Sequence, residues 1–381
     1  MDTKARKQLF GGIKRMVIKV GSGVLTRRNG LNLNVIEDLA ADICHLRGRG
    51  MEVILVSSGA IAAGLRKIGL ARRPAAVSQM QALAAMGQSR LIMAYEEAFA
   101  RYGEKVAQVL LTRDDLTHRR RYLNARNTLF TLLSWKVTPV INENDTVVAD
   151  EIKFGDNDNL SAMVLSLTGA GLLLNLTNID GLYDRDPRQH PYAARIEVVD
   201  RVDRRIRQYA STIPGFLGTG GMASKIAAAR KAALGGAPTV IANGLAPGVI
   251  RDVFAGKPVG TLFLPEPHAL SRKKQWIAFT KAPRGEVFID AGAERALVRN
   301  GKSLLPSGIV RVTGRFAVGN AVVVRGPEGG EIGVGMVNYG AADLRKIAGA
   351  RSSEIEQRLG YRHDDEAIHR DNFVPAGDLE H

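Results

Sequence analysis

Residues 141–161 read INENDTVVADEIKFGDNDNLS and place two groups of amides and carboxylates on either side of one loop. The groups are Asn142, Glu143, Asn144 and Asp145, then Asp156, Asn157, Asp158 and Asn159. The apolar run before them predicts a buried strand, and the run from residue 160 onward predicts a helix. Asn and Asp also form turns and N-caps. Two such groups around one loop nevertheless favour a ligand site between a strand end and a helix N-terminus.

The size and composition of the chain are typical of a globular protein with more than one domain. Of its 381 residues, 45% are hydrophobic and 24% are charged, so we expect two domains and at least one large core. The single cysteine, Cys44, excludes an intramolecular disulfide. Because no apolar run is long enough to predict a signal peptide or a membrane span, we expect a cytoplasmic protein with no membrane partner.

The positive charge lies in the first 275 residues. The net charge is +15, yet residues 276–381 contain fourteen Lys and Arg against fourteen Asp and Glu. A basic N-terminal part suits a phosphorylated substrate. The neutral C-terminal part does not show the charge that is typical of an RNA-binding surface.

Apolar runs alternate with helical stretches over residues 1–265. The predicted strands are residues 16–20, 53–56, 106–111, 138–141, 172–176 and 239–241. The predicted helices are residues 35–46, 75–102, 123–134, 160–168 and 223–234. This order predicts an α/β domain in which helices cover both faces of a mainly parallel sheet. In such folds ligands bind beyond the carboxyl ends of the strands.

The pattern changes near residue 264. Residues 266–283, with several prolines, are expected to be a linker. Residues 284–362 contain short alternating runs between glycine-rich turns, and these predict a small β-barrel or sandwich. We expect residues 363–381 to form a polar tail.

Two glycine-rich segments suit phosphate binding. Lys19 is followed by Gly21 and Gly23 after a predicted strand, which allows backbone N–H groups to approach an oxyanion, although such glycines often only form a turn. Residues 218–225, GTGGMASK, lead into a helix of small residues, and helix N-termini bind phosphate. Lys225 lies in the first turn of that helix, where its charge opposes the helix dipole, so we expect an anionic partner for it.

A third turn, together with the absence of hydrolase and metal-binding motifs from the sequence, indicates which type of reaction to expect. Residues 57–60, SSGA, either hold a carboxylate or use a serine as a helix N-cap. Neither a Ser-His-Asp order nor a pair of metal-binding histidines is present in the sequence. The pattern therefore favours phosphoryl transfer, in which positioning and charge neutralisation supply most of the catalysis, over hydrolysis.

Together these motifs closely resemble the glutamate 5-kinases, a group of the amino-acid kinase family with a C-terminal PUA domain. The similarity spans residues 16–374 and is carried by KVGSGVLT, VSSGAIAAG, QALAAMGQSRL, LLTRDDL, RYLNARNTL, PVINENDTV, FGDNDNLSA, GLYDRDPR, GTGGMASK, VGTLF, SLLPSGI and LRKIAG. The resemblance implies an amino-acid-kinase sandwich over residues 1–265 and a PUA-like domain over residues 284–362.

The resemblance also implies an activity and a set of site residues. The expected reaction is ATP-dependent phosphorylation of the γ-carboxylate of L-glutamate, the first step of proline synthesis from glutamate. Lys19 and Lys225 are expected to neutralise charge on the transferring phosphoryl group, and Asp158 to hold both lysines. Residues expected to bind glutamate are Ser58, Asn142, Asp145 and Asn157, with Asp145 accepting from the ammonium and Asn157 donating to a carboxylate. Residues expected to bind ATP are Lys19, Gly21, Thr177, Asn178, Thr219, Gly220, Gly221, Met222, Ala223, Ser224 and Lys225.

Further expectations concern partners. The resemblance implies that Mg²⁺ is held mainly by nucleotide phosphates with no separate metal site in the protein. It also implies feedback inhibition by proline at the glutamate site, and a homodimer or homotetramer. Two positions depart from the family pattern: Asn178 replaces an expected acidic residue, and Gly23 replaces a common serine.

Two alternatives remain open from the sequence. One is another amino-acid kinase that acts on acetylglutamate or aspartate, which would not be expected to combine INEND and GDNDN with a PUA-like domain. The other is an RNA-binding protein that works through the C-terminal domain. Because that part carries no net charge, we do not expect it to bind RNA.

Overall fold

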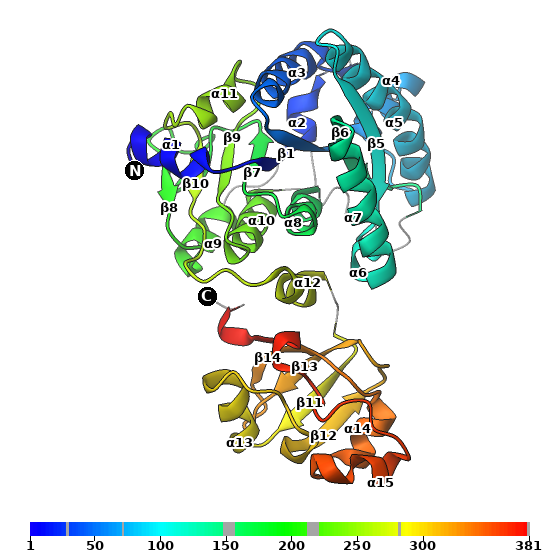
Figure 1. Cartoon of the computed structure of the whole chain (residues 1–381). Helices are drawn as coiled ribbons and strands as arrows, with labels where there is room; N and C mark the ends of the chain where they lie inside the picture. Colours follow the sequence, from blue (N-terminus) through cyan, green and yellow to red (C-terminus); the bar gives the residue numbers. More distant parts are fainter. Residues whose placement is uncertain (28–29, 71, 148–156, 212–220, 281–282, 379–381) are drawn as a thin grey trace. The chain divides into compact units, whose positions relative to one another are not determined.

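The computed structural model describes residues 1–27, 30–70, 72–147, 157–211, 221–280 and 283–378. The chain forms two compact units, Met1–Ala269 and Leu270–His381 (Figure 1). Each unit has hydrophobic cores of its own. The boundary lies within the interval expected to be a linker, but residues Arg272–Thr280 of that interval form helix α12, which packs on the sheet of the smaller unit.

The larger unit is built around an eight-stranded sheet. From one edge to the other the strands are β5 (Lys105–Leu111), β6 (Val137–Glu143), β4 (Glu52–Ser57), β1 (Arg15–Val20), β7 (Leu173–Thr177), β9 (Thr239–Asn243), β10 (Thr261–Phe263) and β8 (Val198–Val199). All neighbouring pairs are parallel except β9 and β10. The mainly parallel sheet expected from the sequence is therefore confirmed, and β8 and β10 extend it beyond the six predicted strands.

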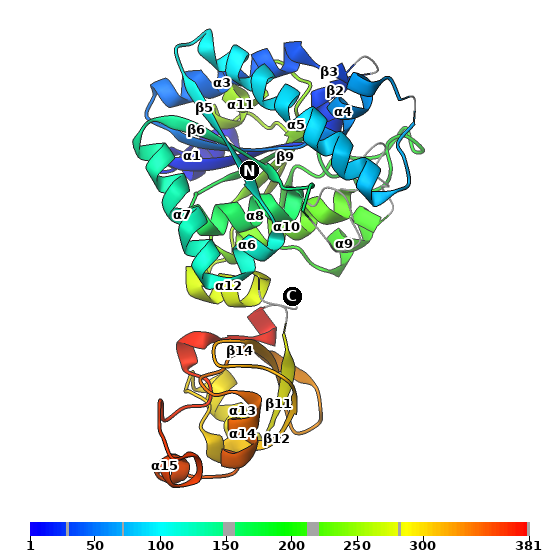
Figure 2. The ribbon, with the colours of Figure 1, turned by 90° about the vertical axis from the view of Figure 1, so that its right-hand side faces the viewer.

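Helices cover both faces of this sheet (Figures 1 and 2). One core joins the sheet to α1 (Thr3–Gly11), α3 (Leu33–Gly48), α5 (Val77–Ala100) and α11 (Val249–Phe254). The core on the other face joins it to α6 (Arg113–Thr117), α7 (Arg119–Ser134), α8 (Asn157–Thr168) and α10 (Met222–Leu234). In β1, Met16 and Ile18 belong to the first core and Val17 to the second, as the alternation of side chains along a strand requires.

Helix α4 (Ala60–Ile68) crosses α5 at very close range. A Cβ atom added to Gly87 would lie 1.8 Å from the carbonyl oxygen of Ala60, and one added to Gly64 would lie 1.9 Å from that of Leu83. Only glycine allows these backbones to approach so closely. Short segments complete the unit: α2 (Ser22–Leu25), the hairpin of β2 (Thr26–Arg27) and β3 (Gly30–Leu31), and α9 (Arg204–Ser211).

The smaller unit contains a five-stranded sheet. Its strand order is β12 (Ile309–Gly314), β11 (Gly285–Ile289), β13 (Ala321–Arg325), β14 (Glu331–Met336) and β15 (Phe373–Pro375). All pairs are antiparallel except β11 and β13. The short helices α13 (Ala291–Glu294), α14 (Ala341–Ile347) and α15 (Ile355–Leu359) accompany the sheet. Strands β11, β12, β13 and β14 lie within residues 284–362, where short alternating runs predicted a β-barrel or sandwich.

The polar tail expected at residues 363–381 is wrong for much of its length. Strand β15 pairs with β14, and Ile368, Phe373 and Val374 are buried in the core of the smaller unit. Two apolar pairs lie among the polar residues of this segment, Ala367 with Ile368 and Phe373 with Val374, and these pairs supply buried side chains.

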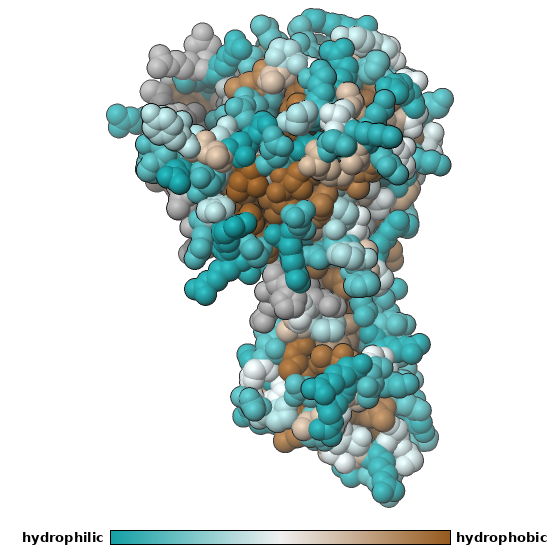
Figure 3. Space-filling view, turned by 90° about the vertical axis from the view of Figure 1, so that its left-hand side faces the viewer, coloured by the Kyte–Doolittle hydropathy of each residue, from teal (hydrophilic) through white to brown (hydrophobic). Residues whose placement is uncertain are grey.

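The surface of the protein is mixed in character. Figure 3 shows mainly hydrophilic side chains on one face, with an apolar patch on the larger unit and apolar areas on the smaller one. Such patches are common on proteins that associate with other chains. Among the described residues, no helix combines the length and apolar character needed to cross a membrane.

Candidate active site

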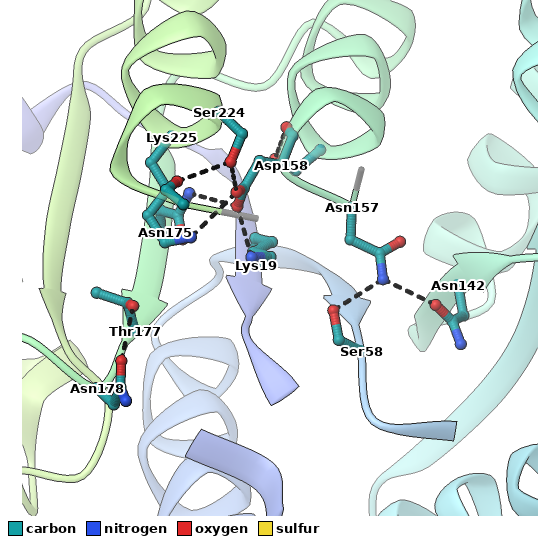
Figure 4. A network of polar contacts seen from close by, with 12 residues as sticks. Lys19, Ser58, Asn142, Asn157, Asp158, Asn175, Thr177, Asn178, Ser224 and Lys225 are labelled. Atoms are coloured by element: carbon teal, nitrogen blue, oxygen red, sulfur yellow. Dashed lines mark hydrogen bonds and ion pairs between the residues drawn. The ribbon is translucent and has the colours of Figure 1, made fainter. Parts of the chain in front are cut away.

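The carboxyl ends of the parallel strands bring the predicted site residues to one edge of the sheet. Lys19 lies in β1, Ser58 follows β4, Asn142 lies near the end of β6, and Thr177 ends β7. Since β1, β4, β6 and β7 run in the same direction, these ends meet on the same side. Figure 4 shows the resulting network of polar contacts.

Asp158 is the centre of this network. Its Oδ1 lies 2.5 Å from Nζ of Lys19, and its Oδ2 lies 3.1 Å from Nζ of Lys225. Ser224 donates from its hydroxyl to Oδ2 at 2.6 Å, and Asn175 donates from its amide to Oδ1 at 3.0 Å. The carboxylate is fully buried, and both lysines are at least 93% buried at their side chains. The three residues expected to form the catalytic centre are thus brought together.

The electrostatics of this cluster favour an ionised carboxylate and a positive site. Burial alone would raise the pKa of Asp158, but the charges of Lys19 and Lys225, with hydrogen bonds from Lys19 and Ser224, lower it well below its ordinary value. The carboxylate of Asp158 thus holds two buried ammonium groups, one at each oxygen. Ammonium groups placed in this way suit an anionic ligand.

Helix α10 supplies a second source of positive potential. It begins after Gly221, and Met222, Ser224 and Lys225 form its first turn with Ala223. Its first N–H groups have no partners within the helix, so they add to the positive potential at this end. Thr219 and Gly220, which were expected to contact ATP, lie outside the described residues.

In the first glycine-rich segment, one backbone N–H group that could approach a phosphate already has a partner within the fold. The N–H group of Gly21 donates to the carbonyl of Leu176 at 3.0 Å, so it is already used within the fold. A Cβ atom at Gly21 would lie 3.8 Å from Nζ of Lys19. An added Cβ would make only ordinary van der Waals contacts there, and the N–H group of Gly21 is used by Leu176 in this arrangement.

Four side chains form a second network next to Asp158. The amide of Asn157 donates to Oγ of Ser58 at 2.8 Å and to Oδ1 of Asn142 at 3.0 Å. The amide of Asn142 donates to Oε1 of Gln88 at 2.8 Å. Nδ2 of Asn157 therefore makes two hydrogen bonds within the fold, and the donor role expected for Asn157 toward a substrate carboxylate stays a prediction.

The structure also decides between the two interpretations of residues 57–60. Helix α4 has Gly59 as its N-cap, with φ of +104°, and no side chain caps it. The hydroxyl of Ser58 instead faces Asn157. The alternative in which a serine only caps the helix is therefore excluded.

Asp145 follows β6 and lies in an unusual environment for a carboxylate. Burial raises its pKa to about 6, and the nearby charge of Arg73 lowers it only in part. Arg73 lies in the loop before α5 and its guanidinium contacts Sδ of Met80 at 3.1 Å. A partly desolvated carboxylate in this position gains most from a cationic group of a ligand.

The two positions that depart from the family pattern lie against each other. A Cβ atom at Gly23 would approach the amide group of Asn178 to 3.3 Å. The hydroxyl of Thr177 contacts Oδ1 of Asn178 at 3.5 Å. A serine at residue 23 would press on Asn178, so the glycine provides room for that side chain.

Two further polar residues of the site were missed from the sequence. Asn175 lies inside the apolar strand β7, and Gln88 lies on the buried face of the long helix α5. Both are buried, with exposed fractions of 0% and 8%. A polar residue within an otherwise apolar buried face is the signal that could have identified each of them.

Comparisons with known proteins identify the relatives of this chain. The model of the amino acid kinase family matches residues 14–243, and the model of the PUA domain matches residues 285–359. The chain is 54% identical over 370 residues to the glutamate 5-kinase of Geobacter sulfurreducens, and 55% identical over 370 residues to that of Geobacter metallireducens. Both matches cover 97% of this chain and 99% of the relative. A similar solved structure is the UMP kinase from Bacillus anthracis, at 18% identity and a TM-score of 0.46, over 66% of this chain and 96% of that chain.

A mainly parallel α/β sheet with two buried lysines around one carboxylate has the charge arrangement that phosphoryl transfer requires. The chain belongs to the amino acid kinase family, and over nearly its full length it is similar to the glutamate 5-kinases of that family.

Proposed function

We propose that this kinase transfers the γ-phosphoryl group of ATP to the γ-carboxylate of L-glutamate. The product is L-glutamyl 5-phosphate, and the reaction is the first step of proline synthesis from glutamate. The observation that carries the proposal is the pair of buried lysines that share Asp158 at the N-terminus of α10. The identity to glutamate 5-kinases over nearly the full length supports glutamate as the acceptor.

The roles of the residues follow from charge. A carboxylate oxygen of glutamate attacks the γ-phosphorus, the bond to the β–γ bridging oxygen breaks, and ADP leaves with that electron pair. Lys19 and Lys225 neutralise the charge that spreads over the phosphoryl oxygens, as is general for phosphoryl transfer. Asp158 acts as a positioning residue, because its two oxygens separate and orient the two ammonium groups.

The remaining residues divide between the two substrates. We assign Ser58, Asn142, Asp145 and Asn157 to glutamate. We assign Thr177, Asn178 and the start of α10, residues 221–225, to ATP, with Thr219 and Gly220 as further candidates. The two buried ammonium groups and the N-terminus of α10 suit the phosphates of ATP.

Mg²⁺ would supply further neutralisation of the phosphate charge when it is bound with ATP. Among the described residues, no group of three or more His, Cys, Asp or Glu is arranged to hold a metal ion. We assign the ion to the nucleotide phosphates, as the resemblance to the family implies.

Inhibition by proline, assembly as a dimer or tetramer and a cytoplasmic location are part of the same proposal and rest on the resemblance to the family. Proline shares the α-carboxylate and the ammonium nitrogen of glutamate, so it would compete for the same side chains.

The test is the formation of an acyl phosphate. The protein is incubated with ATP, Mg²⁺, L-glutamate and hydroxylamine, which converts an acyl phosphate to a hydroxamate, with and without proline. We expect hydroxamate that depends on glutamate and falls when proline is added. Hydroxamate with N-acetylglutamate or aspartate in place of glutamate would overturn the assignment of the acceptor.

A further inference from the structure

The amides of Gln88, Asn142 and Asn157 form a chain with a direction. An amide oxygen and an amide nitrogen have similar shapes, so such a chain can run either way, and its direction must be deduced from its partners. The backbone N–H group of Glu143 decides the question here. It donates to the side-chain atom of Asn142 that lies 2.9 Å away, and an N–H group requires an oxygen as its acceptor.

The rest of the chain follows from this contact. Because Oδ1 of Asn142 accepts from Glu143, the atom that meets it at 3.0 Å is Nδ2 of Asn157. The other end of the Asn142 amide, Nδ2, must then meet an oxygen, and it meets Oε1 of Gln88 at 2.8 Å. The backbone thus imposes one orientation on all three amides.

The amide of Asn157, the last of the three, has an oxygen without a hydrogen-bond partner among the described residues. Nδ2 of Asn157 lies between Ser58 and Asn142, and Oδ1 points away from both (Figure 4). This oxygen is buried and has no hydrogen-bond partner in the part of the chain that the structure describes. Asn157 as a whole is 96% buried, and a buried amide oxygen without a partner is unfavourable. Oδ1 of Asn157 is therefore placed to accept a hydrogen bond from a ligand.

The chemistry of the substrate identifies that donor. L-glutamate has two carboxylates, which only accept hydrogen bonds at neutral pH, and one ammonium, which only donates. An amide oxygen can bind only the ammonium. The hydroxyl of Ser58 accepts from Asn157 and so keeps its own hydrogen for a carboxylate.

We propose that Asn157 accepts a hydrogen bond from the substrate ammonium, and that Gln88, through Asn142, is the positioning residue that holds this orientation. The inference rests on the proposed function, since it takes an amino acid as the substrate. It assigns a role to Gln88 and gives Asn157 the same partner as Asp145.

Because the chain of amides has a direction, two isosteric substitutions within it should affect glutamate binding to different extents. Gln88→Glu keeps an oxygen opposite Nδ2 of Asn142 and replaces only Nε2, which is buried without a partner in the described part of the chain. Asn142→Asp keeps the oxygen that faces Glu143 but sets a second oxygen against Oε1 of Gln88. Gln88→Met removes the acceptor at similar side-chain length. Gln79→Glu, on the exposed side of α5, is the control for an added charge on this helix.

The experiment compares L-glutamate with glutarate, which has both carboxylates and lacks the ammonium. Dissociation constants are measured by calorimetry, and the melting temperature of each variant shows that it is folded. We expect Asn142→Asp and Gln88→Met to weaken glutamate binding about tenfold or more and glutarate binding less than threefold. Gln88→Glu should lose at least fivefold less glutamate affinity than Gln88→Met.

The results that overturn the inference are specific. Equal losses for glutamate and glutarate would show that the amide chain does not act on the ammonium. Equal losses in Gln88→Glu and Gln88→Met would show that the chain runs in the other direction or does not matter. Hydroxamate formation by the unaltered protein tests the proposed function separately, so a failure of one is distinguishable from a failure of the other.

Discussion

Asp158 shows how a single buried carboxylate organises a site for an anion. Each of its oxygens contacts one lysine and one neutral donor, and these contacts fix the orientation of both lysine side chains. A carboxylate in this position aligns both ammonium groups before the substrate arrives, which is the electrostatic preorganisation that phosphoryl transfer needs. In the proposed reaction, the two aligned ammonium groups neutralise charge on the transferring phosphoryl group.

Lys225→Ala should therefore reduce kcat more than it affects the binding of glutamate. We expect kcat to fall by about 10² or more, because an interaction that stabilises charge in the transition state is lost. Steady-state kinetics with varied glutamate measures this, and Lys67→Ala, an exposed lysine of α4, is the control. A raised KM with unchanged kcat would instead assign Lys225 to ground-state binding.

Asp145 should make the capture of glutamate depend on pH. Its pKa is about 6 in the folded protein, above its ordinary value, so the folded state favours the protonated form and stability from this group falls as pH rises through that value. The ammonium of glutamate needs the ionised form. We therefore expect kcat/KM for glutamate to rise as pH increases through about 6, as measured by ADP release.

The matched variant for this prediction is Asp145→Asn. It should raise KM for glutamate and abolish the rise of kcat/KM near pH 6, because the amide does not titrate. A variant that keeps both the original KM and the original pH profile would show that Asp145 does not bind the ammonium.

The crossing of α4 and α5 connects helix packing to the glutamate site. Residues Ser58 and Gly59 lead into α4, and Gln88 lies on α5 one residue after Gly87, where the two backbones come closest. The position of the amide chain relative to Ser58 therefore depends on how tightly these helices pack.

Gly87→Ala should damage both stability and glutamate binding. The new methyl group would overlap the carbonyl oxygen of Ala60 at 1.8 Å, so the helices must move apart. We expect a loss of about 3 kcal/mol, at the upper end of the usual cost of overpacking, and a melting temperature lower by roughly 6–12 °C. KM for glutamate should rise as well.

Gly48→Ala is the control for this substitution. Gly48 ends α3 and has no atom within 4 Å of an added Cβ, so the melting temperature should change little. If both alanine variants melt at the temperature of the unaltered protein, the close contact between α4 and α5 does not contribute to stability.

The smaller unit has a core of its own, and its basic residues are partly used within it. Arg311 stacks on the ring of Phe288 with its Cζ 3.7 Å from the ring centroid, and Arg345 donates to the carbonyls of Val312 and Gly314. These contacts support a structural or regulatory role for the domain, which we propose acts in assembly or in the response to proline.

A truncated chain of residues 1–269 tests this role, because it keeps the whole larger unit. We expect it to remain folded and to form hydroxamate, while its oligomeric state or its inhibition by proline changes. Light scattering and inhibition curves measure the two properties. If activity, oligomer size and proline sensitivity all match those of the full chain, the domain has neither role.

Much of the fold was predictable because hydrophobic periodicity is a local property. The six predicted strands of the larger sheet and the helices between them follow from runs of apolar residues and from the glycines and polar residues that end them. The short strands β8, β10 and β15 were not predicted, since two or three residues carry too little pattern. The polarity of the last segment also concealed β15.

Most of the candidate site was predictable for a related reason. Residues such as Lys19, Asp158 and Lys225 stand out because charged groups follow strands or begin helices in an α/β fold, and the resemblance to a family assigned their roles.

By itself, the sequence determined the order of strands and helices, the edge of the sheet where ligands bind, and the residues that carry charge there. Only the tertiary structure decided which partners they have. Asp158 meets Lys225 across 67 residues of chain, Gln88 meets Asn142 across 54, and the direction of the amides depends on one backbone N–H group of Glu143. The physical reason is that periodicity acts over a few residues, whereas hydrogen bonds between distant segments exist only after the helices and strands have packed.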